Sequence, residues 1–194
     1  SQLLLNELQA SNSSTIADPD IGEYSDWLEL YNDGSSPVNL SGWRLSDSGD
    51  NTEWSIPNGT ILQADSFLLI WADGIGTGLH TSFSLSADGE ELTLYNNAGT
   101  RVDFIAFPAQ LTDVSYGRET NGASTWGFFN QPTPRKSNNT STLFSDYVVQ
   151  EPIFSISGGF FTGPVTVSIA DNYNMGTLRY TLDGAVPSET SPVY

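Results

Sequence analysis

The sequence has no cysteine, a single histidine, only six Lys and Arg residues, and no long hydrophobic run. Without cysteine, disulfide scaffolds, thiol catalysis and cysteine-ligated zinc are excluded. The six basic residues face 23 acidic ones, so the formal net charge is -17. Nucleic acid and anionic lipid surfaces are therefore poor partners, because both require a basic face. No apolar segment approaches the ~18 residues of a membrane span, so we expect no membrane insertion.

The composition that remains is typical of a β-rich globular protein. Of the 194 residues 38% are hydrophobic and 12% aromatic, and there are 18 Gly and 10 Pro. This is too apolar for a disordered chain and too rich in turn formers for a helical bundle. Lys136 is the only lysine. An acidic, nearly lysine-free composition favours an extracellular or bacterial cell-surface protein.

Apolar residues alternate with polar ones along most of the first 110 residues, which predicts strands. The predicted strands are residues 3–9, 25–31, 38–45, 67–71, 91–95 and 102–106. Turn signals such as Asn32-Asp33-Gly34 and Asp88-Gly89 separate them. Many short strands at regular spacing predict an all-β protein with an antiparallel β-sandwich. We expect these side chains in its core: Leu5, Leu28, Leu30, Val38, Leu45, Leu69, Leu92, Leu94 and Ile105.

A second part of the chain follows a polar, proline-punctuated stretch at residues 131–142, which is typical of a linker. Beyond it, residues 153–156, 165–169 and 178–181 are further strand candidates. Only about fifty residues remain there, near the lower limit for a self-sufficient core.

Ordered motifs in the first part resemble the bacterial lamin-tail domain. They lie at residues 6–8, 25–32, 40–47, 67–74, 79–86, 89–95, 113–118 and 132–134. The resemblance covers residues 1–139 and implies an immunoglobulin-like β-sandwich. It also implies a binding or architectural module of secreted and surface proteins, and it specifies no chemistry.

The last part, residues 152–194, resembles the chitobiase/hexosaminidase C-terminal module, a small fibronectin-like β-sandwich. The motifs are residues 152–155, 158–167 and 178–187. In that family the chain continues for several strands past the position of Tyr194, so we expect an incomplete β module joined by a 140–151 linker. We also expect the parent protein to continue, for example into a spore-coat kinase-like domain. An open sheet edge and apolar face, with Phe154, Phe160 and Val167, would then contact the first domain or a neighbouring chain.

The residue types of common active sites are scarce. His80 would have to serve any acid-base scheme, yet no nucleophile elbow or metal spacing surrounds it, which favours a structural role. The five tryptophans permit either sugar stacking or core packing, and strands of a sandwich favour the core. They are Trp27, Trp43, Trp54, Trp71 and Trp126. We therefore expect no catalytic site and no enzyme.

One acidic loop is a candidate calcium site. Asp18, Asp20, Glu23 and Asp26 place four carboxylates within nine residues, and calcium accepts six to eight oxygen ligands in flexible geometry. The spacing differs from that of an EF-hand, and the alternative is a solvated acidic loop without cofactor. Asp47, Asp50 and Glu53 form a second, equally loose group.

These observations predict a non-catalytic interaction, adhesion or structural module. Its expected partners are a protein or a cell-surface polysaccharide. The alternative is a carbohydrate-binding accessory module of a glycan-active enzyme or of a spore-coat kinase-like protein.

Overall fold

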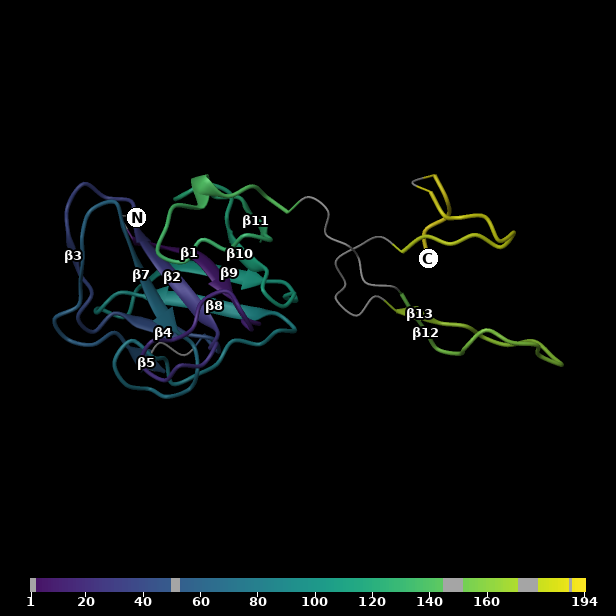
Figure 1. Ribbon diagram of the computed structural model, residues 1–194, viewed down its shortest axis with the longest axis horizontal. Coiled ribbons are helices and arrows are strands. Elements are labelled where there is room, and N and C mark those ends of the chain that lie inside the picture. Colours follow the sequence, from purple (N-terminus) through teal and green to yellow (C-terminus); the bar gives the residue numbers. More distant parts are fainter. Residues whose placement is uncertain (1–2, 50–52, 145–151, 171–177, 189) are drawn as a thin grey trace. The chain divides into compact units, whose positions relative to one another are not determined.

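The chain divides into two compact units in a computed structural model, Ser1–Ser145 and Asp146–Tyr194. The structure describes residues 3–49, 53–144, 152–170, 178–188 and 190–194 (Figure 1). Within these residues no helix has the length and apolar character needed to span a bilayer.

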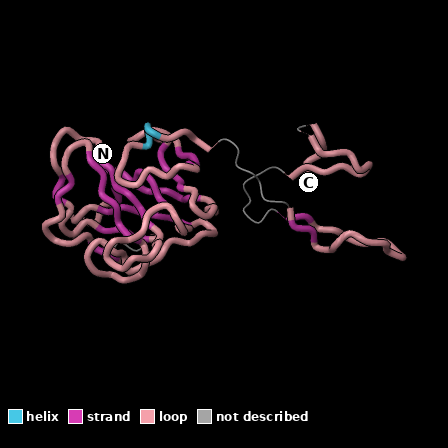
Figure 2. Tube along the Cα trace, in the orientation of Figure 1, coloured by secondary structure: helices cyan, strands magenta, loops and turns pink. Residues whose placement is uncertain are grey.

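The first unit is an immunoglobulin-like β-sandwich, as predicted. A five-stranded sheet has the order β11-β10-β1-β2-β7, a four-stranded sheet has the order β5-β4-β8-β9, and β3 pairs with β6. All these pairings are antiparallel. The strands are β1 (Leu3–Gln9), β2 (Trp27–Asn32), β3 (Val38–Asn39), β4 (Arg44–Ser46), β5 (Trp54–Ser55), β6 (Ile61–Leu62), β7 (Ser66–Trp71), β8 (Glu90–Tyr95), β9 (Arg101–Phe107), β10 (Ser115–Arg118) and β11 (Trp126–Phe129). Loops make up most of the remainder of the described residues of this unit, which also include one short 3₁₀ helix, η1 (Asn138–Thr140) (Figure 2).

The main core contains most of the residues predicted for it. Leu5, Leu28, Leu30, Leu45, Leu92 and Leu94 are buried in one hydrophobic cluster, and Val38 and Ile105 pack against it half-buried. A register shift between Leu5 and Glu7 marks a bulge in β1. The bulge lets Leu3, Leu5 and Leu8 all join this core, which strict alternation would not allow.

The other face of the five-stranded sheet carries a second, smaller core. Trp27, Leu69 and Trp71 are buried there with Ile16 packed against them. Trp27 and its neighbour Leu28 thus point to opposite faces, as alternation along a strand requires. Trp27 Nε1 donates to Gln9 Oε1 at 2.8 Å, so the indole N–H is satisfied. This face is covered by other parts of the same chain instead of being solvated.

Two predictions about the first unit need correction. Residues 38–45 are two strands, not one, because Gly42 adopts φ +73 and Trp43 N–H donates back to Leu40 O at 3.0 Å. The stretch 131–142 is not a free linker. Thr133 and Asn138 are buried, and both bind the polar face of β1. Of the predicted 140–151 linker between the two modules, residues 145–151 lie outside the described residues.

Gly89 allows a close approach of two backbones. It adopts φ +89, and a Cβ there would lie 2.7 Å from Phe107 O. Gly89→Ala should therefore destabilise the first unit by about 2 kcal/mol in denaturant unfolding. Gly59→Ala is the matched control, because Gly59 has φ +86 and open space around it. Equal losses in the two variants would show that the contact with Phe107 has no cost.

The second unit contains little regular structure. β12 (Ile153–Phe154) pairs antiparallel with β13 (Ile169–Ala170), and Arg179 bridges to Val193. Predicted strand residues 165–168 and 178–181 lie outside any strand, although Leu178 O accepts from Tyr194 N–H at 2.9 Å. The expected apolar face is exposed, including Phe154, Phe160 and Val167.

Candidate functional site

Two loops of the first unit meet beside the end of β7. One is the acidic loop between β1 and β2, and the other connects β7 with β8. Ala72 N–H donates to Asp26 O at 2.8 Å, and His80 forms a parallel bridge with Trp71. These backbone contacts bring His80 next to the acidic loop, 60 residues away along the chain.

The acidic loop holds Asp18 in a fixed position. Asp18 N–H donates to Glu23 O at 2.7 Å, and Gly22 N–H donates to Asp18 O at 2.8 Å. Asp18 Oδ1 accepts from Asp20 N–H at 2.9 Å, which is typical of an Asx turn. The Asp18 side chain is completely buried, and its Oδ2 has no hydrogen-bond partner.

His80 is surrounded by carboxylates. Its Nδ1 lies 2.7 Å from Asp73 Oδ2 and 3.5 Å from Asp18 Oδ2, and its Nε2 lies 3.3 Å from Asp20 Oδ2. Burial acts to lower the pKa of His80, but Asp73, Asp20 and Asp18 outweigh it, so the pKa is raised. The arrangement stabilises positive charge at this point.

The four predicted calcium ligands do not all meet. Among the described residues, the group whose ligand atoms lie within 4.8 Å of one another is Asp18, Asp20 and His80. Glu23 is exposed, and Asp26 is half-buried with its carboxylate bound to Asn12 N–H. Burial raises the pKa of Asp26 to about 6. Sequence reasoning missed His80 as a member of this group, and the calcium hypothesis stays a prediction.

The second acidic group shows a simpler arrangement. Asp47 N–H donates to Glu53 Oε2 at 3.1 Å, so these two residues are in contact. Burial and the neighbouring Glu53 raise the pKa of Asp47 to about 6. Asp50 lies outside the described residues.

A pair of buried carboxylates lies on the outer face of the five-stranded sheet. Glu7 and Glu29 are opposite each other on β1 and β2. Glu7 accepts from Ser115 Oγ at 2.5 Å and from Thr133 N–H at 2.9 Å, and Glu29 accepts from Arg135 N–H. Burial raises the pKa of Glu29 to about 9, so this carboxyl is neutral at pH 7. Thr133 and Arg135, from the segment 131–138, donate hydrogen bonds to this pair, so Glu7 and Glu29 attach that segment to the five-stranded sheet.

The tryptophans follow the core-packing prediction. Trp27, Trp54 and Trp71 are buried, and Trp43 and Trp126 are half-buried against the main core. Trp126 also stacks on Tyr116 and lies beneath the Arg118 guanidinium. The first unit therefore presents no row of flat, exposed indole rings.

A nucleophile-base arrangement is not formed around His80. In the described part of the chain, the hydrogen-bond and ion-pair partners of the His80 side chain are all carboxylates. A hydrolase scheme would need a hydroxyl or thiol nucleophile in one of these positions.

Comparison with known proteins gives one family match. The family model described as Lamin Tail Domain matches residues 1–109, more than half of the chain. The match covers β1 to β9 and includes all of Asp18, Asp20, Asp73 and His80. No curated protein sequence matches the chain.

Proposed function

The chain belongs to the lamin tail domain family, and on that premise we propose that it is a non-catalytic interaction module of a secreted or surface bacterial protein. We propose that its partner is a protein. The net charge of -17 argues against nucleic acid as a partner, even though some lamin tails are associated with chromatin.

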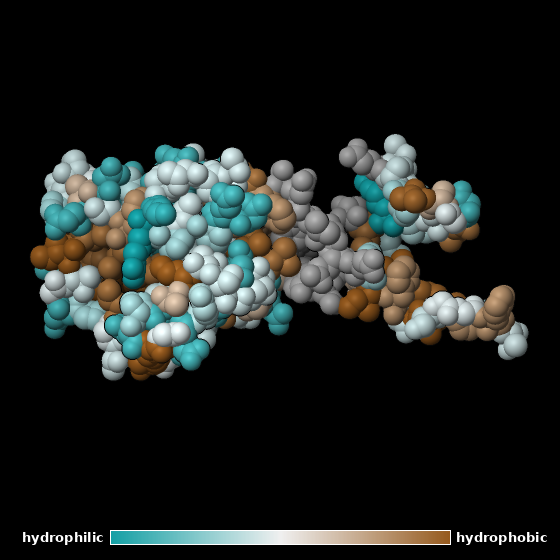
Figure 3. Space-filling model, viewed as in Figure 1, coloured by the Kyte–Doolittle hydropathy of each residue, from teal (hydrophilic) through white to brown (hydrophobic). Residues whose placement is uncertain are grey.

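The observation that most supports an interaction module is the apolar surface of the second unit. Leu182 is 93% exposed, Val186 is 90% exposed and Phe160 is fully exposed. Brown, apolar atoms are accordingly visible on this unit in the space-filling view (Figure 3). Soluble proteins rarely leave so many large apolar side chains in water unless they contact a partner.

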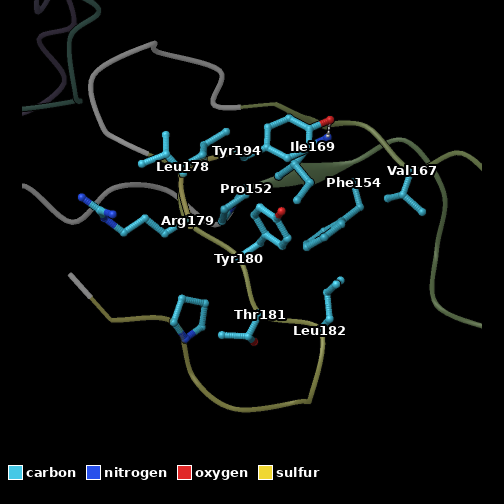
Figure 4. A pocket seen from close by; sticks show the side chains of 12 residues that line it. Pro152, Phe154, Val167, Ile169, Leu178, Arg179, Tyr180, Thr181, Leu182 and Tyr194 are labelled. Carbon is cyan, nitrogen blue, oxygen red and sulfur yellow. Dashed lines mark hydrogen bonds between the residues drawn. The ribbon is translucent and has the colours of Figure 1, made fainter. Parts of the chain in front are cut away.

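The same surface includes a pocket of about 650 Å³. Phe154 and Ile169 line it from β12 and β13, and Tyr180, Leu182 and Tyr194 line it from the C-terminal segment (Figure 4). Tyr194 Oη accepts from Ile169 N–H at 3.1 Å and so ties the two segments together. A pocket with apolar walls and a few polar groups suits an apolar side chain of a protein partner.

We also propose that residues 152–194 are a chitobiase/hexosaminidase C-terminal-type β module. Its antiparallel β12–β13 pair and the antiparallel Arg179–Val193 bridge support this assignment, because each starts from a motif segment and forms the pairing that a small antiparallel β module requires. Modules of this type accompany extracellular proteins, which agrees with the proposed location.

A carbohydrate is the second candidate ligand. The rings of Tyr180 and Tyr194 lie edge to face with centroids 6.4 Å apart at the pocket, and Phe154 is 57% exposed beside them. Aromatic rings at a pocket can stack on sugars, so the chain would then be an accessory module of a glycan-active or spore-coat kinase-like protein.

Binding of the labelled full chain to intact bacterial cells separates these two candidates. We expect saturable binding that disappears after the cells are treated with protease, and no binding to a panel of purified polysaccharides. Leu182→Ser should weaken cell binding at least ~10-fold, because it removes a central apolar contact.

Ile61→Ser is the matched control, since Ile61 is also exposed but lies in the first unit. It should leave binding within about twofold of the wild type, as expected for a residue outside the interface. Binding that survives protease and appears on the polysaccharide panel would favour the carbohydrate. An absence of binding to both would contradict an interaction module.

A further inference from the structure

Asp18 Oδ2 is a buried carboxylate oxygen that accepts no hydrogen bond from the described residues, and its one charge partner among them is the His80 side chain. Asp18 Oδ1 is used by the Asp20 N–H, but Asp18 Oδ2 is buried without any donor. Buried carboxylate oxygens are costly unless they are hydrogen-bonded, paired with charge or bound to a metal. Asp18 Oδ2 lies 3.5 Å from His80 Nδ1, and one ligand atom from each of Asp18, Asp20 and His80 lies within 4.8 Å of the others.

We propose that Asp18, Asp20 and His80 bind a divalent transition-metal ion, with Zn²⁺ as the best fit. His80 Nε2 and one carboxylate oxygen from each aspartate are the ligands. Zn²⁺ binds imidazole nitrogen together with carboxylate oxygen, and three protein ligands leave a fourth position for water. Asp20 has a side chain that is 74% exposed, so ion and water can enter from solvent.

Asp73 is the positioning residue of this site. Its Oδ2 lies 2.7 Å from His80 Nδ1, and its Oδ1 accepts from Ile75 N–H at 3.1 Å. A metal-bound histidine nearly always donates its other ring N–H to a carboxylate or carbonyl. The Asp73 contact therefore fixes Nδ1 as the donor and leaves Nε2, on the side of Asp20, for the metal.

The ligand types favour zinc over calcium. Calcium needs six to eight oxygen ligands, whereas this group supplies one nitrogen and two carboxylates. Of the other acidic residues in the loop, Glu23 is exposed and Asp26 is engaged by Asn12 N–H. A bound Zn²⁺ would join the β1–β2 loop to the β7–β8 loop, independently of the partner bound by the second unit.

The single histidine makes the test direct. In the chelator-treated full chain, the imidazole carbon and proton resonances of His80 can be followed by NMR during addition of Zn²⁺ at pH 7. We expect them to shift and to saturate at one equivalent, while the same concentration of Ca²⁺ leaves them in place. The proposal would be overturned if the His80 resonances did not shift, or if their shift did not saturate, at about 1 mM Zn²⁺. This concentration is far above the dissociation constant expected for a preformed zinc site.

Variants identify the ligands. Asp73→Asn should weaken Zn²⁺ binding about 10–100-fold, and Asp18→Asn should weaken it at least as much. Glu23→Gln is the matched control in the same loop and should leave Zn²⁺ binding within about twofold of the wild type, because it removes no ligand. Loss of binding in Glu23→Gln, or a Ca²⁺-induced shift equal to that of Zn²⁺, would assign the site to the acidic loop and contradict zinc. The wild-type titration decides the question even if a variant fails to fold.

Discussion

Asn138→Ala is expected to lower the free energy of unfolding of the first unit by about 3–4 kcal/mol. Asn138 is completely buried, and its amide bridges three segments of the chain. Its Nδ2 donates to Arg118 O at 2.7 Å and to Asn6 O at 3.2 Å, and its Oδ1 accepts from Asn6 Nδ2 at 2.9 Å. Alanine leaves these buried groups without partners, and each such group costs about 1–3 kcal/mol.

Urea unfolding of the full chain, followed by tryptophan fluorescence, measures this effect, because all five tryptophans lie in the first unit. Asn139→Ala is the adjacent control. Asn139 is exposed, and its side chain accepts one bond, from Asn121 N–H at 3.1 Å. Equal, small losses in both variants would mean that residues 131–138 do not close the polar face of the sheet.

The stability of the first unit should fall as the pH rises from about 5 to about 9. Burial, opposed by the Arg135 N–H and reinforced by the nearby Glu7, raises the pKa of Glu29 from 4.5 to about 9. The native state then keeps a proton that the unfolded chain releases near pH 4.5. Between these values the native state binds more protons, so increasing pH favours unfolding, by a few kcal/mol over the whole window.

Glu29→Gln should remove this contribution, since glutamine resembles the neutral carboxyl and can still accept from Arg135 N–H. We expect the variant to equal or exceed the wild type in stability at pH 9, with a flatter dependence on pH in urea unfolding. Glu91→Gln, at an exposed position of β8, serves as the control and should keep the wild-type slope. A Glu29→Gln slope identical to that of the wild type would show that Glu29 is ionised in the folded protein.

Alternation of apolar residues was sufficient to predict the long strands of the first unit. β1 has the predicted bounds, and β2, β7, β8 and β9 differ from the predicted ranges by one or two residues. Burial of Leu28 and Trp27 on opposite faces also follows from period two. The short strands β5, β6, β10 and β11 were missed because two to four residues carry too little pattern to separate them from loops.

The polar stretch after residue 130 shows where composition misleads. Proline, serine and asparagine are typical of linkers, yet Thr133 and Asn138 are buried because buried acceptors on β1 require donors. Their roles depend on partners more than 100 residues away in sequence. No local pattern encodes such a contact.

The group formed by Asp18, Asp20 and His80 could be predicted only in part from the sequence, for the same reason. Asp18 and Asp20 stood out as a local acidic cluster, but His80 joins them only through the pairing of the two loops beside β7. The density of acidic residues along the chain favoured Glu23 and Asp26 as much as Asp18 and Asp20, yet the close group contains neither of them. The one available signal was that His80 is the single histidine of the sequence.

The proposed function is tested most directly by site-specific photo-crosslinking on intact bacterial cells. A benzoylphenylalanine is placed at the position of Leu182 in one full-length chain and at the position of Ile61 in another. Binding through the apolar surface of the second unit should give a discrete, protease-sensitive adduct from position 182 and none from position 61. Adducts from position 61 alone, or equal adducts from both positions, would contradict binding through the apolar surface of the second unit.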